Sequence, residues 1–409
     1  MRKIILMALL AVFNVSLAQE RKTAFQVPKD IASIPNDMLY GIVEPLWERD
    51  GTKSKFQVTG FNLDTAVGLM ELLGVRSFRM MFKEVFDNSS EFDADLIQYH
   101  KSAIKKLNQA GVNHIIGMCM IFPTNSGFSP KGIYAVPQLL DPNYQGWLIQ
   151  VSNTWEKISA LFPEISYWEM GNELNEDFFF YPNGYSGGFG SENGGVFTKQ
   201  DKIAHILNYM FYASKGIKKG NPRAVTVMPG LSPGRKGLES NELADFMELL
   251  YEGIHSNNYP LGAIKSNKSD DYFEILAWHP YAVLGKVDQA WMQANKAIYD
   301  VAKKYGDGHK PVFFTEIGFT DYGDEPSEIH QIKLMKDVFN FIKTDLFFVK
   351  NVTAFRLFEC TGALAWGGKG EIHFGYFKEP SGQIGFSPKM KAFSLQTIYG
   401  GKGDLRKFE

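Results

Sequence analysis

The fold of this chain is decided by the stretch Tyr167-Trp168-Glu169-Met170-Gly171-Asn172-Glu173-Leu174-Asn175. It begins as an apolar strand and ends in an amide, a carboxylate and a second amide. The stretch Pro311-Val312-Phe313-Phe314-Thr315-Glu316-Ile317-Gly318-Phe319 has the same pattern, a short hydrophobic strand that carries one glutamate to its tip. Polar residues at the exit of a buried strand are typical of catalytic positions. The two stretches therefore predict two strands that bring Glu173 and Glu316 together.

Apolar runs and helical stripes alternate along the rest of the chain. Between residues 63 and 73, apolar residues recur at helical spacing, and Gly74 follows them as a helix cap. Further helices are predicted at residues 96–107, closed by Gly111, and at residues 144–161, 202–218, 243–254, 291–301, 329–342 and 389–398. Strands are predicted at residues 38–43, 76–82, 112–120, 224–228, 273–278 and 352–358, and around Trp168 and Phe313.

Eight strands that alternate with eight helices predict a single α/β domain, a (β/α)₈ TIM barrel with long loops on its C-terminal face. The rival fold is a doubly wound open sheet. It is disfavoured because no glycine-rich phosphate loop follows the first strand. In a barrel the functional residues lie at the C-terminal ends of the strands, and both glutamates are predicted there, on the fourth and seventh strands.

The first residues have the pattern of an export signal. Arg2 and Lys3 precede an apolar run at residues 4–13, and Ser16-Leu17-Ala18 is a small-residue cleavage site. No apolar run reaches the roughly 18 residues of a membrane-spanning helix. We therefore expect a signal peptide at residues 1–18, a single (β/α)₈ domain at residues 19–409, a secreted or periplasmic location and no membrane span.

Composition narrows the classes of partner. A net charge of −2 argues against a nucleic-acid partner, and the 14% of aromatic residues suits a protein that stacks rings against sugars. Cys119 and Cys360 lie in separate apolar segments, so two buried free thiols are expected. No pair of histidines has the spacing of a metal site, so neither a metal nor a cofactor is predicted. Several histidines instead fall in helical segments, namely His100, His205, His255 and His330.

Together, these motifs resemble glycoside hydrolase clan A, whose members are retaining enzymes on a (β/α)₈ barrel. The resemblance covers nearly the whole mature chain and rests on the order and spacing of its marks. Besides the two quoted stretches, the marks are Gly74-Val75-Arg76-Ser77-Phe78-Arg79, Trp278-His279-Pro280-Tyr281, Phe374-Gly375-Tyr376-Phe377 and Ser387-Pro388-Lys389. The histidine-proline-tyrosine and threonine-glutamate-isoleucine-glycine signatures look most like family 39. Gly171 before the Asn-Glu pair is also similar to arabinofuranosidase and glucuronidase families.

The resemblance implies a role for each marked polar residue. Glu173 would be the general acid and base, Glu316 the nucleophile, and Asn172 a hydrogen-bond partner of the 2-hydroxyl of the sugar. Arg79 would hold Glu316 ionised, or else form a salt bridge inside the barrel with Glu169.

The sixth strand offers two further candidates. His279 would belong to the site, unless it is a buried histidine with both nitrogens bonded. Tyr281 would donate to Glu316, unless its hydroxyl lies in water on the rim. On the eighth strand, many clan members carry a tryptophan beneath the sugar, and here Phe358 or Trp366 would take that place.

The predicted function is a retaining hydrolase of β-glycosidic bonds in oligo- or polysaccharides, with Glu316 as nucleophile and Glu173 as acid/base. The alternatives are an α-L-arabinofuranosidase-type debranching enzyme, a non-catalytic sugar-binding barrel and a metal-dependent barrel hydrolase. The aromatic segment at residues 176–197 is expected either to plug the barrel rim or to form a sugar-stacking wall.

Overall fold

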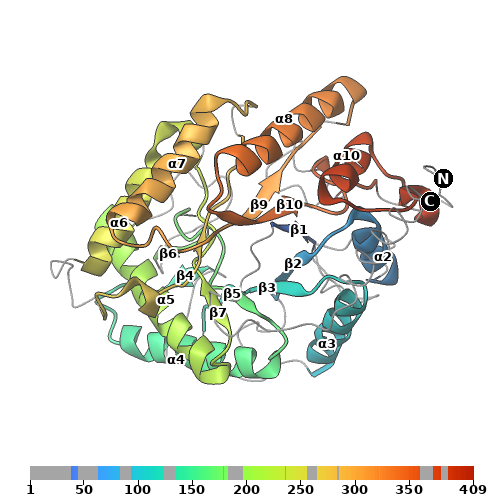
Figure 1. Ribbon diagram of the computed structural model, residues 1–409. Helices are drawn as coiled ribbons and strands as arrows, with labels where there is room; N and C mark the ends of the chain where they lie inside the picture. Colours follow the sequence, from blue (N-terminus) through green and yellow to red (C-terminus); the bar gives the residue numbers. More distant parts are fainter. Residues whose placement is uncertain are drawn as a thin grey trace, which may run out of the picture.

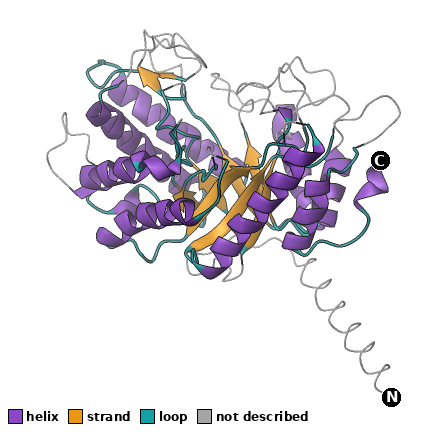
Figure 2. Ribbon diagram, turned by 90° about the horizontal axis from the view of Figure 1, so that it is seen from above, coloured by secondary structure: helices purple, strands orange, loops and turns teal. Residues whose placement is uncertain are grey.

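The computed structural model describes most of the chain after the first strand begins. The described residues are 38–44, 63–82, 94–123, 134–177, 179–182, 197–234, 236–255, 265–282, 285–321, 323–359, 372–378 and 386–409. The predicted signal peptide, Cys360 and Trp366 lie outside these residues. In the described part, parallel strands stand at the centre and helices surround them (Figures 1 and 2).

The central sheet has eight strands in the order β7-β5-β3-β2-β1-β10-β9-β8. Each strand pairs in parallel with its neighbours, and β1 pairs with both β2 and β10, so the first and last strands meet. Isolated bridges from Val227 to Ile275 and from Leu231 to Trp278 join the two outer strands and close the barrel. The strands are β1 (Leu39–Val43), β2 (Ser77–Met81), β3 (His114–Met118), β5 (Tyr167–Glu169), β7 (Val225–Val227), β8 (Leu276–Ala277), β9 (Val312–Gly318) and β10 (Val349–Phe355).

The helices follow the strands in alternation and form the outer ring of Figure 1. They are α2 (Leu63–Leu73), α3 (Ala94–Gln109), α4 (Tyr144–Leu161), α5 (Lys199–Gly220), α6 (Glu242–His255), α7 (Gln289–Lys304), α8 (Glu325–Thr344) and α10 (Met390–Tyr399). Short 3₁₀ turns add η2 (Leu238–Ser240), η4 (Ser269–Asp271) and η5 (Leu405–Phe408), and β4 (Ala135–Val136) pairs with β6 (Tyr181–Pro182) at the rim. The predicted alternation of strands and helices is therefore confirmed.

Local sequence signals set the ends of several helices. Gly74 and Gly111 follow α2 and α3 with φ of +84° each, a conformation that L side chains avoid. At the start of α5, the hydroxyl of Thr198 accepts a hydrogen bond from the backbone N–H of Asp201 at 3.1 Å. At the start of α8, the carboxylate of Asp324 accepts from the backbone N–H of Ser327 at 2.8 Å.

The last strand differs from its prediction. It was expected at residues 352–358 but runs from Val349 to Phe355. The chain then turns away because Glu44, at the end of β1, accepts hydrogen bonds from the Arg356 side chain at 2.6 Å and the Phe358 backbone at 3.0 Å. Phe358 pairs with Phe377 in the closing segment instead of extending the sheet. The sixth predicted strand, at residues 273–278, is likewise reduced to Leu276–Ala277.

Alternation along the strands separates a polar interior from an apolar exterior. Trp168 points outward against Phe82 and Trp155, whereas its neighbour Glu169 is fully buried inside the barrel. A register shift breaks the alternation in β9: Val352 pairs with Phe314, but Ala354 pairs with Ile317. Two residues of β9 therefore face one residue of β10, which is a β-bulge. Because of this bulge, the consecutive residues Thr315 and Glu316 of β9 both reach the barrel interior.

Two other expectations concern single features. Cys119 is a buried free thiol, as predicted, and burial raises the pKa of that thiol well above its ordinary value. Within the described ranges, we find no helix with both the length and the apolar character needed to cross a bilayer.

Candidate active site

Glu173 lies on a tight turn that follows β5. Its backbone φ is +47°, a left-handed conformation that is rare for a residue other than glycine and concentrates at functional sites. The turn is held from the neighbouring strand segment, since the backbone N–H of Glu173 donates to Gly230 O at 2.9 Å. Asn175 exchanges two hydrogen bonds with the backbone of Ser232, at 2.9 and 3.0 Å. The buried Lys202 of α5 also donates to Asn175 O at 2.8 Å. The carboxyl group of Glu173 is thus fixed in place by its backbone.

Glu316 reaches the same place from β9 because of the bulge. Its Oε1 accepts from Arg79 Nη1, and its Oε2 accepts from the Tyr281 hydroxyl at 2.9 Å. Burial alone would raise the pKa of Glu316, but the charges of His279 and Arg79 and these hydrogen bonds lower it below its ordinary value. The predicted contacts of Arg79 and Tyr281 with this carboxylate are confirmed.

Arg79 lies at the centre of the polar interior. Besides Glu316, it binds Glu169 through Nε at 2.5 Å and through Nη2 at 3.0 Å, and Nη2 donates to Asn172 Oδ1 at 2.8 Å. Burial opposes the charge, but the two carboxylates raise the pKa of Arg79 above its ordinary value. Both partners foreseen for Arg79 are therefore present at once. The Nδ2 group of Asn172 takes part in none of these bonds and is left to donate to a ligand.

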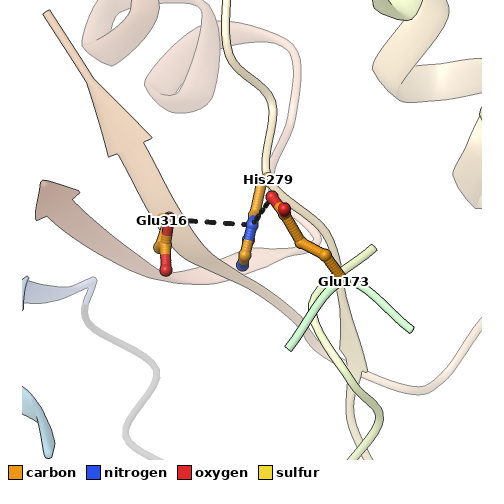
Figure 3. Close-up of side chains that lie close together, drawn as sticks. All are labelled: Glu173, His279 and Glu316. Carbon is orange, nitrogen blue, oxygen red and sulfur yellow. Dashed lines mark hydrogen bonds and ion pairs between the residues drawn. The ribbon is translucent and has the colours of Figure 1, made fainter. Parts of the chain in front are cut away.

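His279 connects the two glutamates. Its Nδ1 lies 2.7 Å from Glu173 Oε1 and 3.8 Å from Glu316 Oε2, and its Nε2 lies 3.1 Å from Thr315 Oγ1. Figure 3 shows the imidazole between the two carboxyl groups. The side chain is fully buried, which lowers the pKa of His279, but the charge of Glu316 and the hydrogen bond and charge of Glu173 raise it above its ordinary value. Both alternatives for His279 therefore hold: it is a buried histidine with both nitrogens bonded, and one of its two partners is Glu173.

The site contains one oxygen from each glutamate and one nitrogen of His279, all within 4.8 Å of one another. Carboxyl groups about 5–5.5 Å apart are typical of retaining glycosidases, whereas about 6.5–9.5 Å leaves room for the water of an inverting one. The same three groups could hold a metal ion, but the guanidinium of Arg79 already neutralises Glu316, which disfavours a second cation there.

Two other clusters of acidic residues and histidine in the described part of the chain have the spacing of metal ligands. In both clusters, lysines already form ion pairs with the carboxylates. Lys310 contacts Asp270 at 2.8 Å and Asp307 at 3.2 Å, beside His309. In the other group, Asp321 contacts Lys389 at 2.6 Å and Lys391 at 2.8 Å. Glu359 and His373 complete this group. Both are better described as ion-pair clusters.

The expectation for Phe358 is wrong. Phe358 is fully buried, and its ring packs against Phe386 at 4.4 Å and Phe377 at 6.4 Å between ring centroids. Phe355 takes the tip of the strand instead. Its half-buried ring lies 6.5 Å from that of Tyr281 and 5.4 Å from that of Phe374. The other candidate, Trp366, lies outside the described residues.

The aromatic segment after Glu173 is a plug where the structure describes it. Phe180 is fully buried and packs against Phe122 at 5.9 Å and Phe197 at 5.9 Å, and Phe197 packs against His205 at 4.4 Å. Residue 178 and residues 183–196 lie outside the described part.

Sequence reasoning missed Thr315 and gave Glu169 only as a possible partner of Arg79. Thr315 Oγ1 lies 2.9 Å from Glu169 Oε1, and Glu169 Oε1 also accepts from the backbone N–H of Gly230 at 3.0 Å. Alternation along β5 places Glu169 on the face opposite the outward Trp168, and so inside the barrel. No signal in the sequence reveals the bulge that places Thr315 and Glu316 on the same side.

No family profile and no curated protein sequence matches the chain. Solved structures do match it. The chain is similar to an exo-β-1,4-mannosidase from Opitutaceae bacterium strain TAV5, with 12% identity over 93% of this chain and a TM-score of 0.59. It spans 63% of the length of that protein.

Two further similar structures are matched over nearly their whole length. A hyperthermophilic β-glucosidase from Pyrococcus furiosus is 12% identical over 91% of this chain and 98% of its own, with a TM-score of 0.58. A GH5-4 broad specificity endoglucanase from Clostridium longisporum is 12% identical over 92% of this chain and 100% of its own, with a TM-score of 0.59. The fold is that of a TIM barrel. At these identities the likeness establishes the architecture, and the activity has to be argued from the site.

Proposed function

We propose that this protein is a retaining glycoside hydrolase that cleaves β-glycosidic bonds in oligo- or polysaccharides. The observation that carries the proposal is the close approach of two differently held carboxyl groups, with oxygens of Glu173 and Glu316 within 4.8 Å. The similar structures reported above, described as a mannosidase, a glucosidase and an endoglucanase, support the same reaction class.

In the first step, Glu316 attacks the anomeric carbon while Glu173 gives a proton to the leaving oxygen. Arg79 and Tyr281 keep Glu316 ionised and fix its two oxygens, so that the carboxylate is presented in one orientation. Asn172 is buried with its Oδ1 bonded to Arg79, so its Nδ2 is set to donate to the sugar hydroxyl next to the reacting carbon.

In the second step, Glu173 takes a proton from water, whose oxygen attacks the anomeric carbon and releases Glu316. The Tyr281 hydroxyl stabilises the carboxylate as it leaves. The same polar groups serve both steps, as microscopic reversibility requires of one acid/base residue.

The sugar is the finer part of the proposal. The resemblance to family 39 favours a β-xyloside or a related β-linked sugar, and an α-L-arabinofuranoside is the second candidate because Gly171 precedes the Asn-Glu pair. Export to the periplasm or medium through residues 1–18 belongs to the same proposal and suits a polysaccharide substrate.

The test uses a panel of aryl β-glucosides, β-mannosides, β-xylosides and α-L-arabinofuranosides with the purified protein, in buffer with and without a chelator. Proton NMR of the first product released from the best substrate then gives its anomeric configuration. Retained configuration with chelator-resistant turnover is expected. An inverted product would exclude Glu316 as nucleophile, loss of turnover with chelator would favour a metal hydrolase, and binding without turnover would favour a sugar-binding barrel.

A further inference from the structure

The two glutamates are joined by a continuous chain of hydrogen bonds inside the barrel. From Glu173 the chain passes to His279, from His279 to Thr315, and from Thr315 to Glu169. Arg79 binds Glu169 and Glu316 and completes the connection. His279, Thr315, Glu169 and Arg79 are all fully buried, so solvent does not exchange for any partner in the chain. The bonds between these four residues are therefore made by protein groups alone.

The hydroxyl of Thr315 can point its single proton in only one direction. Glu169 is a carboxylate bound by the guanidinium of Arg79, and its Oε1 already accepts from Arg79 Nη2 and the backbone N–H of Gly230, both at 3.0 Å. A carboxylate has no proton to give, so Thr315 donates to Glu169. The Thr315 oxygen is then left as an acceptor for His279 Nε2, which must carry a hydrogen.

The hydrogen on Nε2 determines how many protons the pair of Nδ1 and Glu173 holds. A distance of 2.7 Å between His279 Nδ1 and Glu173 Oε1 requires one proton between them. The proton belongs either to the imidazolium or to the carboxylic acid, and in both cases the pair holds one. If Nε2 lacked its hydrogen, a neutral imidazole would instead carry it on Nδ1 and leave Glu173 with no proton to give.

We propose that Thr315 is a positioning residue for proton transfer, which holds the imidazole so that His279 and Glu173 store the one proton that the leaving group takes. This inference rests on the proposed function for its catalytic consequence. In the first step the bond from the anomeric carbon to the leaving oxygen breaks, the pair gives its proton to that oxygen, and Glu316 bonds to the carbon. In the second step water returns one proton to the pair, and its oxygen displaces Glu316.

The charges that face His279 assist the release. Glu173, Glu316 and Arg79 are the charged groups around it, and the ionised Glu316 favours the protonated imidazole. When Glu316 becomes an ester it loses its charge, so the pair holds its proton less tightly at the moment when the leaving oxygen needs it. Thr315 and Glu169 contribute by keeping the ring oriented throughout.

The test compares Thr315→Val, which keeps the shape of the side chain, with Thr315→Ser, which keeps the hydroxyl. Thr353→Val is the matched control, because Thr353 is also fully buried and its hydroxyl donates at 2.8 Å to Asn351 instead. Protein labelled with ¹⁵N-histidine gives the protonation of each ring nitrogen by NMR, and His279→Gln identifies the His279 signals. Turnover is measured with an unactivated alkyl glycoside and with a 2,4-dinitrophenyl glycoside, whose leaving group needs no proton.

A hydrogen on Nε2 of His279 is expected in the wild-type protein and in Thr315→Ser. Thr315→Val should lose this preference and lower kcat on the unactivated substrate about tenfold, with KM and the dinitrophenyl rate nearly unchanged. A bare Nε2 in the wild-type protein, or equal losses on both substrates, would overturn the inference. If no glycoside is cleaved, the proposed function fails, while the NMR result still decides whether Thr315 orients His279.

Discussion

The two glutamates of the site are buried to a similar degree but held in different ways. Their side chains are 14% exposed for Glu173 and 11% for Glu316. Glu316 has a donor on each oxygen, a permanent cation on one and a phenol on the other. Among the described hydrogen bonds of its carboxyl group, Glu173 has one, to the titratable imidazole of His279.

We infer from this difference that partners, and not burial, distinguish the proposed roles of the two carboxyl groups. Arg79 cannot release its proton, so it holds Glu316 as an anion at any pH near neutrality. A partner such as His279 can instead share or return a proton. The asymmetry fits one carboxylate that attacks and one carboxyl group that exchanges protons.

Removing either carboxyl group should lower activity more than any other change. Glu316→Ala removes the proposed nucleophile and should lower turnover by roughly 10⁵-fold or more on every substrate. Glu173→Ala should lower turnover of unactivated glycosides by roughly 10²–10⁴-fold but spare the first step with a dinitrophenyl glycoside. Azide should rescue Glu173→Ala with retained configuration and Glu316→Ala with inverted configuration. Similar losses in both variants without rescue would mean that the roles are assigned wrongly.

Removing the cation on the Glu316 side should cost stability as well as activity. Arg79→Met leaves Glu169 fully buried without its counter-charge, and breaking a buried pair in this way costs about 3–5 kcal/mol. Chemical denaturation should show the loss. The double variant Arg79→Met/Glu169→Gln should recover part of the stability but no activity. If the single variant is as stable as the wild type, Glu169 is not an ionised partner.

Removing the phenol should have a smaller effect, confined to the rate. Tyr281→Phe deletes the hydrogen bond to Glu316 Oε2 and should cost about 1.5–3 kcal/mol at the transition state, a tenfold to hundredfold fall in kcat/KM. Thermal melts should be unchanged. Tyr272→Phe is the control, because that hydroxyl donates to Ser266 O, away from the site. Wild-type kcat/KM in Tyr281→Phe would remove the phenol from the mechanism.

His205 is a second fully buried histidine, and its surroundings differ from those of His279. His205 is buried among Phe180, Phe197 and Tyr144, neither ring nitrogen has a hydrogen-bond partner among the described residues, and burial lowers the pKa of His205 from 6.5 to about 3. Between these values the unfolded chain binds a proton that the folded chain does not. This group should therefore reduce stability as pH falls below 6.5, by about 1.4 kcal/mol per pH unit, and contribute nothing above it.

His205→Phe should remove this acid sensitivity. We expect the free energy of unfolding to change little at pH 7.5 and to rise by about 1–2 kcal/mol at pH 5 relative to the wild type. Urea titrations at both pH values measure it, with replacement of the exposed His330 by phenylalanine as the control. An equal shift at both pH values would indicate a packing effect alone.

The sequence predicts the parts of this structure that depend on local patterns. The helix at residues 144–161 is found with the predicted bounds, since its amphipathic stripe is continuous. Glu173 and Glu316 converge as predicted because parallel strands of a barrel end on one face. Tyr281 follows from its place after β8, the neighbour of β9, whereas Arg79 on β2 reaches Glu316 from another strand of the barrel and was expected from the resemblance.

The parts that escaped prediction depend on tertiary contacts. The last strand begins earlier than expected because the polar Asn351 is accepted inside the barrel, where its Nδ2 donates to Ser77 Oγ at 2.7 Å. Thr315 was overlooked because strict alternation would have placed Thr315 and Glu316 on opposite faces, and the bulge overrides it. Phe358 is one of the two candidates for the place beneath the sugar because the predicted strand ends there, but the strand of the structure ends three residues earlier, at Phe355.

The junction between β7 and β8 should open more readily than the rest of the barrel. Isolated bridges join these strands where the other neighbours form regular ladders, and the backbone N–H of His279 donates to Leu231 O at 2.9 Å across it. Such a junction is the place where backbone amides should exchange with deuterium first. Gly230, which anchors the Glu173 turn, and His279 lie on opposite sides of the junction. A sugar bound in the site would therefore stabilise this junction. Slower amide exchange there would report sugar binding without any turnover.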